Sequence, residues 1–538
     1  MLSTMMQFPL TLTPLLDRVE RIFPHVEMVS RRPDTSLHRQ TYADFARRSR
    51  QLASALRRAG MQPGDRVATL MWNHHAHVEA YFGIPCAGGV LHTLNLRLHP
   101  DDLTYIVTHA EDRFVIVDDV LWPLWEKVAP RVAVEKTIVV SWKGGPLPEG
   151  VIDYEAFLAS GDAAEPLPTL DENAPLGMCY TSGTTGKPKG VVYSHRAIVL
   201  HSFAVCLTDG LGLSNRDVML PVVPQFHANA WGLPFASVMA GTKQVLPGPH
   251  LDAANLLDLF IREQVTLAAG VPTVWMAILQ TLDANPGKYT LTKGMRMLVG
   301  GSAAPESMIR GFDRHGAAIL HAWGMTELSP LGTVATVKKG IEDGGEDAVY
   351  AARSKQGLPS PFVEMRAVSD TGEVPWDGVA QGELQVRGPW VAASYYGAED
   401  TSDRWTEDGW FRTGDVVTID KDAYLKLTDR TKDLIKSGGE WISSVELENE
   451  IMGHPAVAEA AVIAISHPKW VERPLACVVL KPGQSLSFEE LREFLKPRVA
   501  AWWLPDLVEY VDAIPRTSTG KFLKSALRER FKDLVSNA

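Results

Sequence analysis

Strand-like and helix-like segments alternate along the first two-thirds of the chain, and this alternation restricts the fold more than any other feature of the sequence. Residues 65–72 are expected to form a strand, followed by a helix at 77–88 and a second strand at 90–95. A helix at 101–110 then precedes a strand at 114–119. Such alternation builds mostly parallel sheets with helices on both faces. We therefore predict an α/β fold with layered mixed or parallel sheets.

The same alternation returns farther along the chain, where two expected strands end in glycine-containing loops. A strand at 295–301, a helix at 305–314 and a strand at 317–324 follow one another. The loops are GGSAAP (300–305) and GMTE (324–327). Because open α/β sheets bind ligands beyond the carboxyl ends of their strands, both loops are expected to line a binding site.

A change of pattern near residue 383 indicates a second domain, and a chain of 538 residues is also too long for one core. Short strands and turns dominate from there, and Ser443 with Glu446 three residues later is typical of a helix N-terminus. Strand and helix alternation then continues along the rest of the chain. We predict a large N-terminal domain, 1–431, and a small α+β C-terminal domain, 432–538.

Composition argues against several classes of protein. The net charge of −11 disfavours nucleic-acid binding, which needs a basic face. No run approaches the roughly 18 apolar residues of a membrane-spanning helix, and the N-terminus lacks the pattern of a secretory signal. We predict a cytoplasmic protein and leave peripheral contact with a membrane open. Buried, reduced thiols are expected because no CxxC pair occurs among Cys86, Cys179, Cys206 and Cys477.

The ten residues 181–190, TSGTTGKPKG, combine small, hydroxyl-bearing and cationic side chains in the manner of a phosphate-binding loop. They do not form a Walker A loop, because only two residues separate Gly183 from Gly186. Pro188 also stands where Ser or Thr should coordinate magnesium. A flexible surface turn is the alternative. We favour a phosphate-binding loop of another kind, which carries Lys189 and lies between two strands.

The sequence YTSGTTGKPKGVVYSHRA (180–197) resembles a motif of the adenylate-forming superfamily: acyl-CoA synthetases, adenylation domains of peptide synthetases and firefly luciferase. The bacterial medium- and long-chain fatty acyl-CoA synthetases are the most similar group, and the resemblance covers essentially the whole chain. It implies a large N-terminal domain and a small, mobile C-terminal domain. Five further motifs agree in order: GGSAAP (300–305), HAWGMTE (321–327), GWFRTGD (409–415), DRTKDLIKSGGEWIS (429–443) and PRTSTGK (515–521).

The implied reaction has two steps and needs ATP, Mg²⁺ and coenzyme A. A carboxylate first attacks the α-phosphate of ATP, giving an acyl-adenylate and pyrophosphate, and the thiol of CoA then displaces AMP. The carboxylate is already ionised near pH 7, so the first step needs no strong base. Its barrier is the approach of an anion to a polyanion, which cations and oriented amides can lower.

The resemblance implies an ATP site built from loops that are far apart in the sequence. Asp415 would accept both ribose hydroxyls with Arg430 nearby, and Thr326 would contact the α-phosphate. Glu327 with help from Thr181 would hold Mg²⁺, which prefers oxygen ligands; a solvated carboxylate is the alternative for Glu327. Further residues would hold the phosphates (Thr181, Ser182, Gly183, Thr184, Thr185, Gly186, Lys189), flank the adenine (Gly301, Ser302, His321, Ala322, Trp323, Gly324) or lie at the hinge (Lys432).

The two steps are expected to use different faces of the small domain, which rotates about a hinge near Lys432. In the first step Lys521 would neutralise the charge that develops between the carboxylate and the α-phosphate. Lys436 and Trp441 would line the site of the second step. Gly438 and Gly439 would allow the thin pantetheine arm to approach the backbone closely.

The segment PQFHANAWGLPF (224–235) is expected to form the entrance of the acyl site, with Ala228 and Gly232 in its lining. His227 stands where amino-acid-activating relatives have Asp, so an amino acid substrate is disfavoured. We place His227 beside the acyl carboxylate, the alternative being a structural histidine. Trp231 matches a tryptophan that gates the acyl tunnel in long-chain relatives, the alternative being core packing. Gln225 adds a polar group near this entrance and leaves chain length open.

Several functions stay open beside fatty acid activation. The acid could be short or modified, such as 3-methylmercaptopropionate, or an aryl acid, and a luciferase-like oxygenase uses the same adenylation residues. A non-enzymatic lipid-binding protein is a further alternative. Relatives are commonly homodimers, so a homodimer is expected.

Three histidines and a glutamate lie close together at 74–79. Of these residues, only His75 and Glu79 would share one face of a helix, so we do not expect a zinc site. A loop-to-helix junction near the surface is the favoured interpretation.

Overall fold

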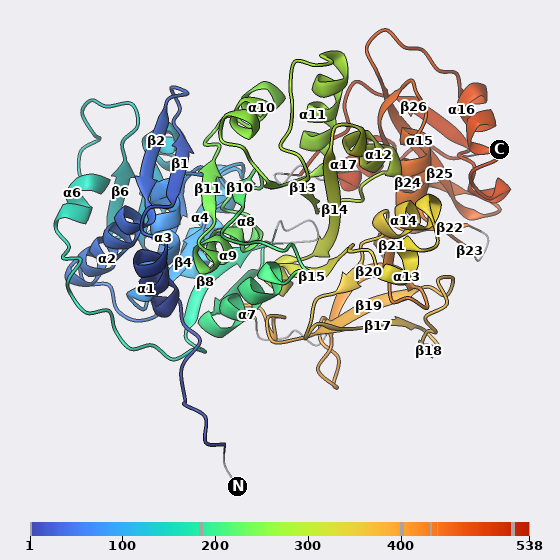
Figure 1. Cartoon of the computed structure of the whole chain (residues 1–538). Helices are drawn as coiled ribbons and strands as arrows, with labels where there is room; N and C mark the ends of the chain where they lie inside the picture. The colour runs from blue at the N-terminus through green and yellow to red at the C-terminus, as the bar shows by residue number, and fades with distance from the viewer. Residues whose placement is uncertain are drawn as a thin grey trace.

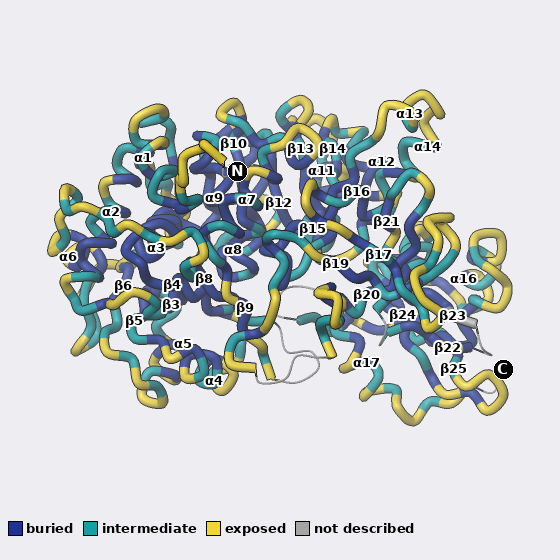
Figure 2. The backbone as a smooth tube through the Cα atoms, turned by 90° about the horizontal axis from the view of Figure 1, so that it is seen from below, coloured by how far each residue is buried: buried dark blue, intermediate teal, exposed yellow. Residues whose placement is uncertain are grey.

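The computed structural model of the chain describes residues 3–181, 187–398, 403–430, 433–437, 440–517 and 522–536. The described strands assemble into four sheets, and the C-terminal elements lie together at one end of the molecule (Figure 1). Buried residues run through the sheets, while exposed residues lie on the outer loops and helices (Figure 2).

The largest sheet has nine strands, of which six central neighbours, β14 to β1, are parallel. The strands at both edges run antiparallel to their neighbours. In spatial order the strands are β16 (Leu358–Pro359), β15 (Leu331–Val334), β14 (Ala317–Gly324), β13 (Met295–Val299), β12 (Leu267–Gly270), β10 (Val218–Pro221), β11 (Lys243–Leu246), β1 (Glu27–Arg31) and β2 (Leu37–Thr41).

Successive residues of these strands face opposite layers of the fold, because side chains alternate along a strand. Ala268 packs in a cluster with three helices on one face, α10 (Ala253–Arg262), α11 (Pro272–Ala284) and α12 (Glu306–Arg314). Leu267 and Ala269 belong to the cluster on the other face, with residues of α7 (His195–Cys206) and α9 (Leu233–Ala240). The parallel strands are thus buried on both sides, as their hydrophobic sequences predict.

A second sheet of seven strands carries the phosphate loop between its last two strands. Neighbours are parallel except β8 and β9, which pair antiparallel. The loop therefore joins two strands, as expected, instead of opening a helix as a Walker A loop does. The order is β7 (Ile152–Asp153), β6 (Lys136–Val140), β5 (Asp112–Asp118), β3 (Arg66–Leu70), β4 (Val90–Thr93), β8 (Pro175–Tyr180) and β9 (Gly190–Ser194).

Helix α3 (His75–Cys86) lies in the core between these two sheets. All of its residues are buried, which a helix with hydrophobic residues on every side requires. It contacts strands of both sheets as well as α9 and α2 (Tyr42–Arg58). Other helices of this region are α1 (Thr13–Ile22), α4 (Pro100–Ala110), α5 (Trp122–Trp125) and α6 (Tyr154–Ala159).

Two smaller sheets complete the fold. One is antiparallel, in the order β18 (Gly372–Glu373), β17 (Glu364–Ser369), β19 (Gly382–Arg387), β20 (Phe411–Ile419) and β21 (Leu425–Arg430). The other contains β23 (Glu440–Ile442), β22 (Ile435–Ser437), β25 (Val471–Leu480), β24 (Val457–His467) and β26 (Leu507–Tyr510). The C-terminal helices are α15 (Ser444–Met452), α16 (Phe488–Leu495) and α17 (Lys524–Arg530).

The predicted α/β architecture is confirmed, and the last sheet has a hydrophobic core of its own with α15 and α16. The predicted boundary between residues 431 and 432 lies outside the described residues and stays a prediction. Ser443 caps α15, because its Oγ accepts a hydrogen bond from the Glu446 backbone N–H at 3.0 Å. The Glu446 carboxylate pairs instead with Lys426 at 3.1 Å. In the part of the chain that the structure describes, no helix is long and apolar enough to cross a membrane.

The histidines at the start of α3 are buried, so the prediction of a position near the surface was wrong. His74 and His77 are only 2% and 0% exposed. Nε2 of His74 lies 2.8 Å from Oδ1 of Asp118, and Glu79 pairs with Arg48 at 2.7 Å. Burial lowers the pKa of His77 to about 3, which keeps the ring neutral. His74 and Glu79 thus each have a partner from another element, Asp118 and Arg48. Among the described residues, no group of His, Cys, Asp or Glu is arranged to hold a metal ion.

Candidate functional site

The two ends of the phosphate loop are held together at the antiparallel pair β8 and β9. The Thr181 backbone N–H donates to the Lys189 carbonyl at 2.9 Å, and the Lys189 N–H donates to the Thr181 hydroxyl at 3.2 Å. The Lys189 ammonium lies 4.8 Å from the centre of the Tyr395 ring. Five predicted phosphate ligands lie outside the described residues and stay predictions: Ser182, Gly183, Thr184, Thr185 and Gly186.

Thr326 and Glu327 lie on a short 3₁₀ helix (Thr326–Leu328) that follows β14. The Glu327 side chain is not a solvated carboxylate, since the residue is only 5% exposed. The Tyr395 hydroxyl donates to Oε1 of Glu327 at 2.7 Å, and the Tyr193 hydroxyl donates to the Thr326 carbonyl at 2.8 Å. Burial raises the pKa of Tyr395 and the Glu327 carboxylate raises it further, so Tyr395 stays a donor.

The chemistry of this donor set fits Mg²⁺. A buried carboxylate from Glu327 and a hydroxyl from Thr181 are hard oxygen ligands. Mg²⁺ is commonly held by one or two carboxylates together with the phosphates of a nucleotide, so a larger protein cage is not needed. The pair therefore suits an ion that arrives bound to ATP.

Asp415, the predicted ribose ligand, is buried on β20 and already has two side-chain partners. Nε1 of Trp323 donates to its Oδ2 at 2.8 Å, and Nε of Arg430 lies 3.4 Å from its Oδ1. Arg430 comes from the neighbouring strand, directly opposite Asp415. Because a carboxylate offers about four lone-pair positions, the ribose hydroxyls can still bind. The structure thus brings together one residue predicted at the adenine and two predicted at the ribose.

His321 supports the loop predicted to flank the adenine. The Ala304 backbone N–H donates to Nε2 of His321 at 3.3 Å, which ties the loop after β13 to β14. Burial lowers the pKa of His321 to about 4, so the ring is neutral and can accept this bond. Gly301 and Ser302 of the same loop are exposed. Ala322 is buried and Gly324 half-buried at the end of β14.

The segment predicted to form the acyl entrance contains an unusual left-handed turn. Four consecutive non-glycine residues have φ near +50°: Ala228 (42°), Asn229 (54°), Ala230 (50°) and Trp231 (57°). This conformation costs an L-residue roughly 1–2 kcal/mol, and such strain gathers at functional sites.

Packing on both sides holds this turn in place. A Cβ atom on Gly300 would lie 3.0 Å from the Trp231 ring, so the indole packs against the start of the adenine loop. A Cβ atom on Gly232 would lie 2.5 Å from the His201 ring, so only glycine fits there. Trp231 is half-buried, and its predicted gating role stays a prediction.

Gln225 anchors the same segment to the start of α3. It is fully buried, and its Oε1 accepts from the His74 backbone N–H at 3.1 Å. The backbone N–H of Gln225 donates to Oδ1 of Asn73 at 2.7 Å. His227 is half-buried two residues later, and its predicted contact with the acyl carboxylate stays untested.

The residues predicted for the second step are described only in part. Lys436 is exposed on β22, where its backbone N–H donates to Glu472 at 2.7 Å, and its Cα lies opposite that of Trp441 on β23. Gly438, Gly439, Lys432 and Lys521 lie outside the described residues. Their roles remain predictions.

Comparison with known proteins identifies the family. The sequence pattern of the family described as AMP-binding enzyme matches residues 19–396. A second pattern, AMP-binding enzyme C-terminal domain, matches residues 446–521. The chain belongs to the AMP-binding enzyme family. The predicted resemblance to adenylate-forming enzymes is therefore confirmed.

Relatives within this AMP-binding family match the chain over its whole length. A long-chain-fatty-acid–CoA ligase from Thermus thermophilus is 49% identical over 100% of this chain and 98% of that protein. A 3-methylmercaptopropionyl-CoA ligase from Ruegeria pomeroyi is 46% identical over 100% of both. A medium-chain-fatty-acid–CoA ligase from Ectopseudomonas oleovorans is 44% identical over 99% and 98%. Among solved structures, ATP-bound MatB from Rhodopseudomonas palustris is 26% identical with a TM-score of 0.82, over 98% and 99%.

Sequence reasoning missed the tyrosines that contact the residues predicted to bind ATP. Tyr395 touches both Lys189 and Glu327, and Tyr193 holds the backbone of Thr326. The only signal for Tyr395 was a pair of tyrosines in SYYG (394–397), and nothing in the sequence indicates their partners.

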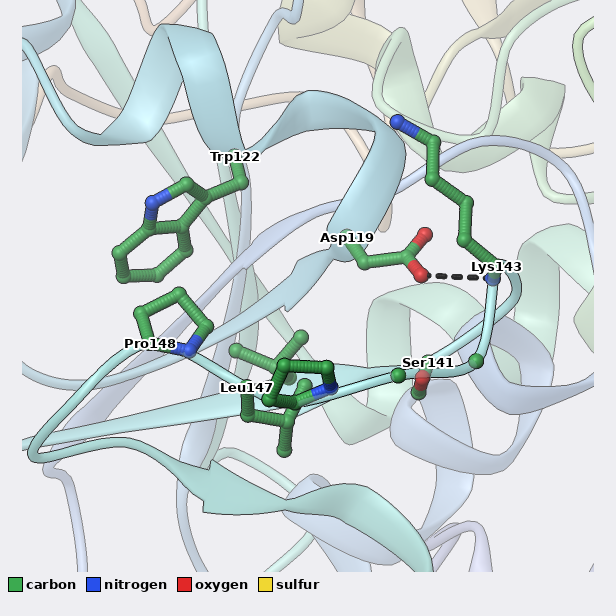
Figure 3. A pocket seen from close by; sticks show the side chains of 10 residues that line it. Asp119, Trp122, Ser141, Lys143, Leu147 and Pro148 are labelled. Carbon is green, nitrogen blue, oxygen red and sulfur yellow. Dashed lines mark hydrogen bonds between the residues drawn. The ribbon is translucent and has the colours of Figure 1, made fainter.

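A cavity of about 200 Å³ lies elsewhere, beside β6 and the short helix α5 (Figure 3). Asp119, Trp122 and Lys143 are among its lining residues, and none of the lining residues belongs to the predicted AMP-binding site. Asp119 accepts a hydrogen bond from the Lys143 backbone at 2.8 Å, so it fixes the local turn.

Proposed function

We propose that the protein is an AMP-forming acid–CoA ligase that converts a medium- or long-chain fatty acid, through an acyl-adenylate and release of pyrophosphate, to acyl-CoA and AMP. The single observation that carries the proposal is that Tyr395 contacts both Lys189, the cation predicted to bind phosphate, and the buried carboxylate of Glu327. Relatives named as long-chain and medium-chain fatty-acid–CoA ligases support the choice of acid.

The first step follows from charge. The fatty acid carboxylate is ionised at neutral pH, so it needs no base but must approach the triphosphate. Lys189 would reduce the negative charge on the phosphates, and Lys521 would do so between the carboxylate and the α-phosphate. Asp415 and Trp323 would fix the nucleoside so that the α-phosphate is held in line with the acid.

Glu327 and Thr181 would hold Mg²⁺, which would supply positive charge to stabilise the phosphates and the pyrophosphate leaving group. We further propose a cytoplasmic homodimer: the location rests on the composition of the sequence, and the homodimer on the resemblance alone. Peripheral contact with a membrane is consistent with the exposed apolar side chains Met5, Met6 and Phe8.

A CoA ligase for 3-methylmercaptopropionate is the second candidate, because the Ruegeria pomeroyi relative matches the whole chain at 46% identity. The two candidates would share the nucleotide site and would differ in the acyl space that Trp231 is predicted to gate. The two candidates are therefore distinguished by which acid the protein adenylates fastest, because both require adenylation.

The test is acid-dependent ATP–pyrophosphate exchange, followed by thioester formation after CoA is added. The acids are straight chains from butyrate to stearate, 3-methylmercaptopropionate and benzoate. Exchange strongest with medium or long chains supports the proposal, whereas a maximum with 3-methylmercaptopropionate favours the second candidate. Exchange at background with every acid contradicts both and favours a non-enzymatic lipid-binding protein.

A further inference from the structure

The segment 392–396 connects the two elements predicted to hold phosphate and metal. The Ala392 backbone N–H donates to the Glu327 carbonyl at 2.7 Å. Four residues later, the Tyr396 N–H donates to the Gly190 carbonyl at 2.8 Å, at the end of the phosphate loop. These two bonds hold the phosphate loop and Glu327 to one short piece of backbone.

Tyr395 lies between those two bonds and touches both functional side chains. Its hydroxyl donates to Oε1 of Glu327 at 2.7 Å, while its ring centre lies 4.8 Å from the Lys189 ammonium. The ring is itself fixed, because Trp405 packs against it edge-on at 5.2 Å. Nε1 of Trp405 in turn donates to the Ala392 carbonyl at 2.8 Å.

Tyr395 keeps the charged side chains of Glu327 and Lys189 from pairing directly with each other. A buried carboxylate needs donors, but a direct ion pair between Lys189 and Glu327 would withdraw both groups from ATP and its metal. The tyrosine hydroxyl supplies a neutral donor to one oxygen of Glu327. The aromatic face attracts the ammonium by a cation–π interaction of roughly 0.5–2 kcal/mol, which is weak enough for the lysine to leave for a phosphate.

We propose that Tyr395 is a positioning residue for adenylation: its hydroxyl orients the Glu327 carboxylate toward the metal, and its ring holds Lys189 beside the phosphate site. The inference rests on the proposed function, because it assumes that Glu327 and Lys189 bind the metal and phosphates of ATP. Residues that orient metal ligands in this way commonly change metal affinity by 10–100-fold when removed.

Two variants of Tyr395 separate its two contacts. Tyr395→Phe keeps the ring but removes the hydroxyl, so the Kd for Mn²⁺ should rise about tenfold. Tyr395→Leu removes the ring as well, so binding of the nucleotide should also weaken. Mn²⁺ binding is measured by electron paramagnetic resonance in the presence of α,β-methylene-ATP, and binding of the same analogue without metal is measured by calorimetry in EDTA. Tyr395→Phe should bind the metal-free analogue as the wild type does.

Tyr154→Phe is the matched control. The Tyr154 hydroxyl donates to Oε2 of buried Glu79 at 2.8 Å, so this change removes the same kind of bond at a carboxylate that is not predicted to bind ATP. It should lower the unfolding temperature without changing the Kd for Mn²⁺. If the role of Tyr395 were only structural, Tyr395→Phe would likewise lower the unfolding temperature and leave the Kd for Mn²⁺ unchanged.

The outcomes separate this inference from the proposed function. If the wild-type protein catalyses ATP–pyrophosphate exchange but Tyr395→Phe binds Mn²⁺ with an unchanged Kd, the inference alone is overturned. No wild-type exchange with any acid would overturn the proposed function. A weaker Mn²⁺ affinity in Tyr395→Phe, with normal metal-free nucleotide binding and normal Tyr154→Phe, supports the positioning role.

Discussion

At the scale of single residues, Asp415 is held from two sides: Trp323 donates to one oxygen of its carboxylate, and Arg430 lies beside the other. Both partners orient the group before any nucleotide binds. The carboxylate can therefore act as a fixed double acceptor for the ribose, which a mobile surface Asp could do only at an entropic cost.

Asp415→Asn is expected to raise the KM for ATP about tenfold, because a charge-assisted hydrogen bond is worth roughly 1.5–3 kcal/mol. The ribose is distant from the bonds that change, so kcat should fall little. Initial rates of ATP–pyrophosphate exchange give both constants. Asp420→Asn is the control, because Asp420 pairs with Lys355 at 2.5 Å and is not a predicted ligand. An unchanged KM for ATP in Asp415→Asn would remove the ribose assignment.

The sequence predicted which residues belong to the ATP site better than it predicted the contacts between their side chains. The motifs indicated that Glu327 and Lys189 belong to an ATP site, but not that one side chain touches both. Tyr395 stands 68 positions from Glu327, and its contact depends on how two loops fold. The histidines of 74–79 were misplaced for a related reason: their polar type suggests a surface, whereas Asp118 and Thr69 supply buried partners from other strands.

At the scale of secondary-structure elements, the sequence predicted existence and type better than exact ends. The helix expected at 77–88 is α3, which begins two residues earlier, at His75, after an extended His74. The strand expected at 317–324 is β14 with the same bounds. Hydrophobic periodicity defines such elements locally. The left-handed turn at 228–231 could not be foreseen, because Ala and Trp disfavour positive φ, Asn adopts it only as a single residue, and packing maintains the run.

Gly232→Ala tests how tightly this turn is held. Gly232 has φ of +73°, and an added Cβ would meet the His201 ring at 2.5 Å, so alanine adds steric overlap to backbone strain. Gly287→Ala is the matched control, because Gly287 has φ of +78° with nothing within 4 Å of the added atom. The unfolding temperature should fall for both variants and further for Gly232→Ala, by a margin equivalent to about 1–3 kcal/mol of overpacking. Equal shifts would show that the turn moves aside freely.

At the scale of the whole molecule, buried histidines predict how stability depends on pH. Burial lowers the pKa of His77 and His201 to about 3, and that of His195 and His321 to about 4. These rings stay neutral in the folded state, whereas the unfolded chain takes up protons near pH 6.5. The unfolded state therefore binds more protons between about pH 6.5 and 4, and stability should fall as the pH falls through this window.

His201→Gln should make this loss less steep, by up to about 1.4 kcal/mol per pH unit below the unfolded pKa. Glutamine can still accept the Leu331 backbone N–H that His201 accepts at 3.2 Å. Urea unfolding at several pH values measures the slope. His99→Gln, the same substitution at a side chain that is 70% exposed, serves as the surface control. A slope in His201→Gln equal to that of the wild type would contradict the buried-histidine origin of acid sensitivity.

The proposed rotation of the small domain predicts that the two chemical steps can be lost separately. Lys521→Ala should abolish ATP–pyrophosphate exchange but spare thioester formation from synthetic acyl-adenylate, because the predicted role of the lysine is limited to the step in which charge develops at the α-phosphate. Gly439→Leu should keep exchange and block the second step, since a side chain would obstruct the pantetheine arm. Both steps are measured on each variant with the same acid. If either variant lost both steps equally, one fixed arrangement of the domains would serve both reactions. Rotation about the hinge near Lys432 would then not be needed for catalysis.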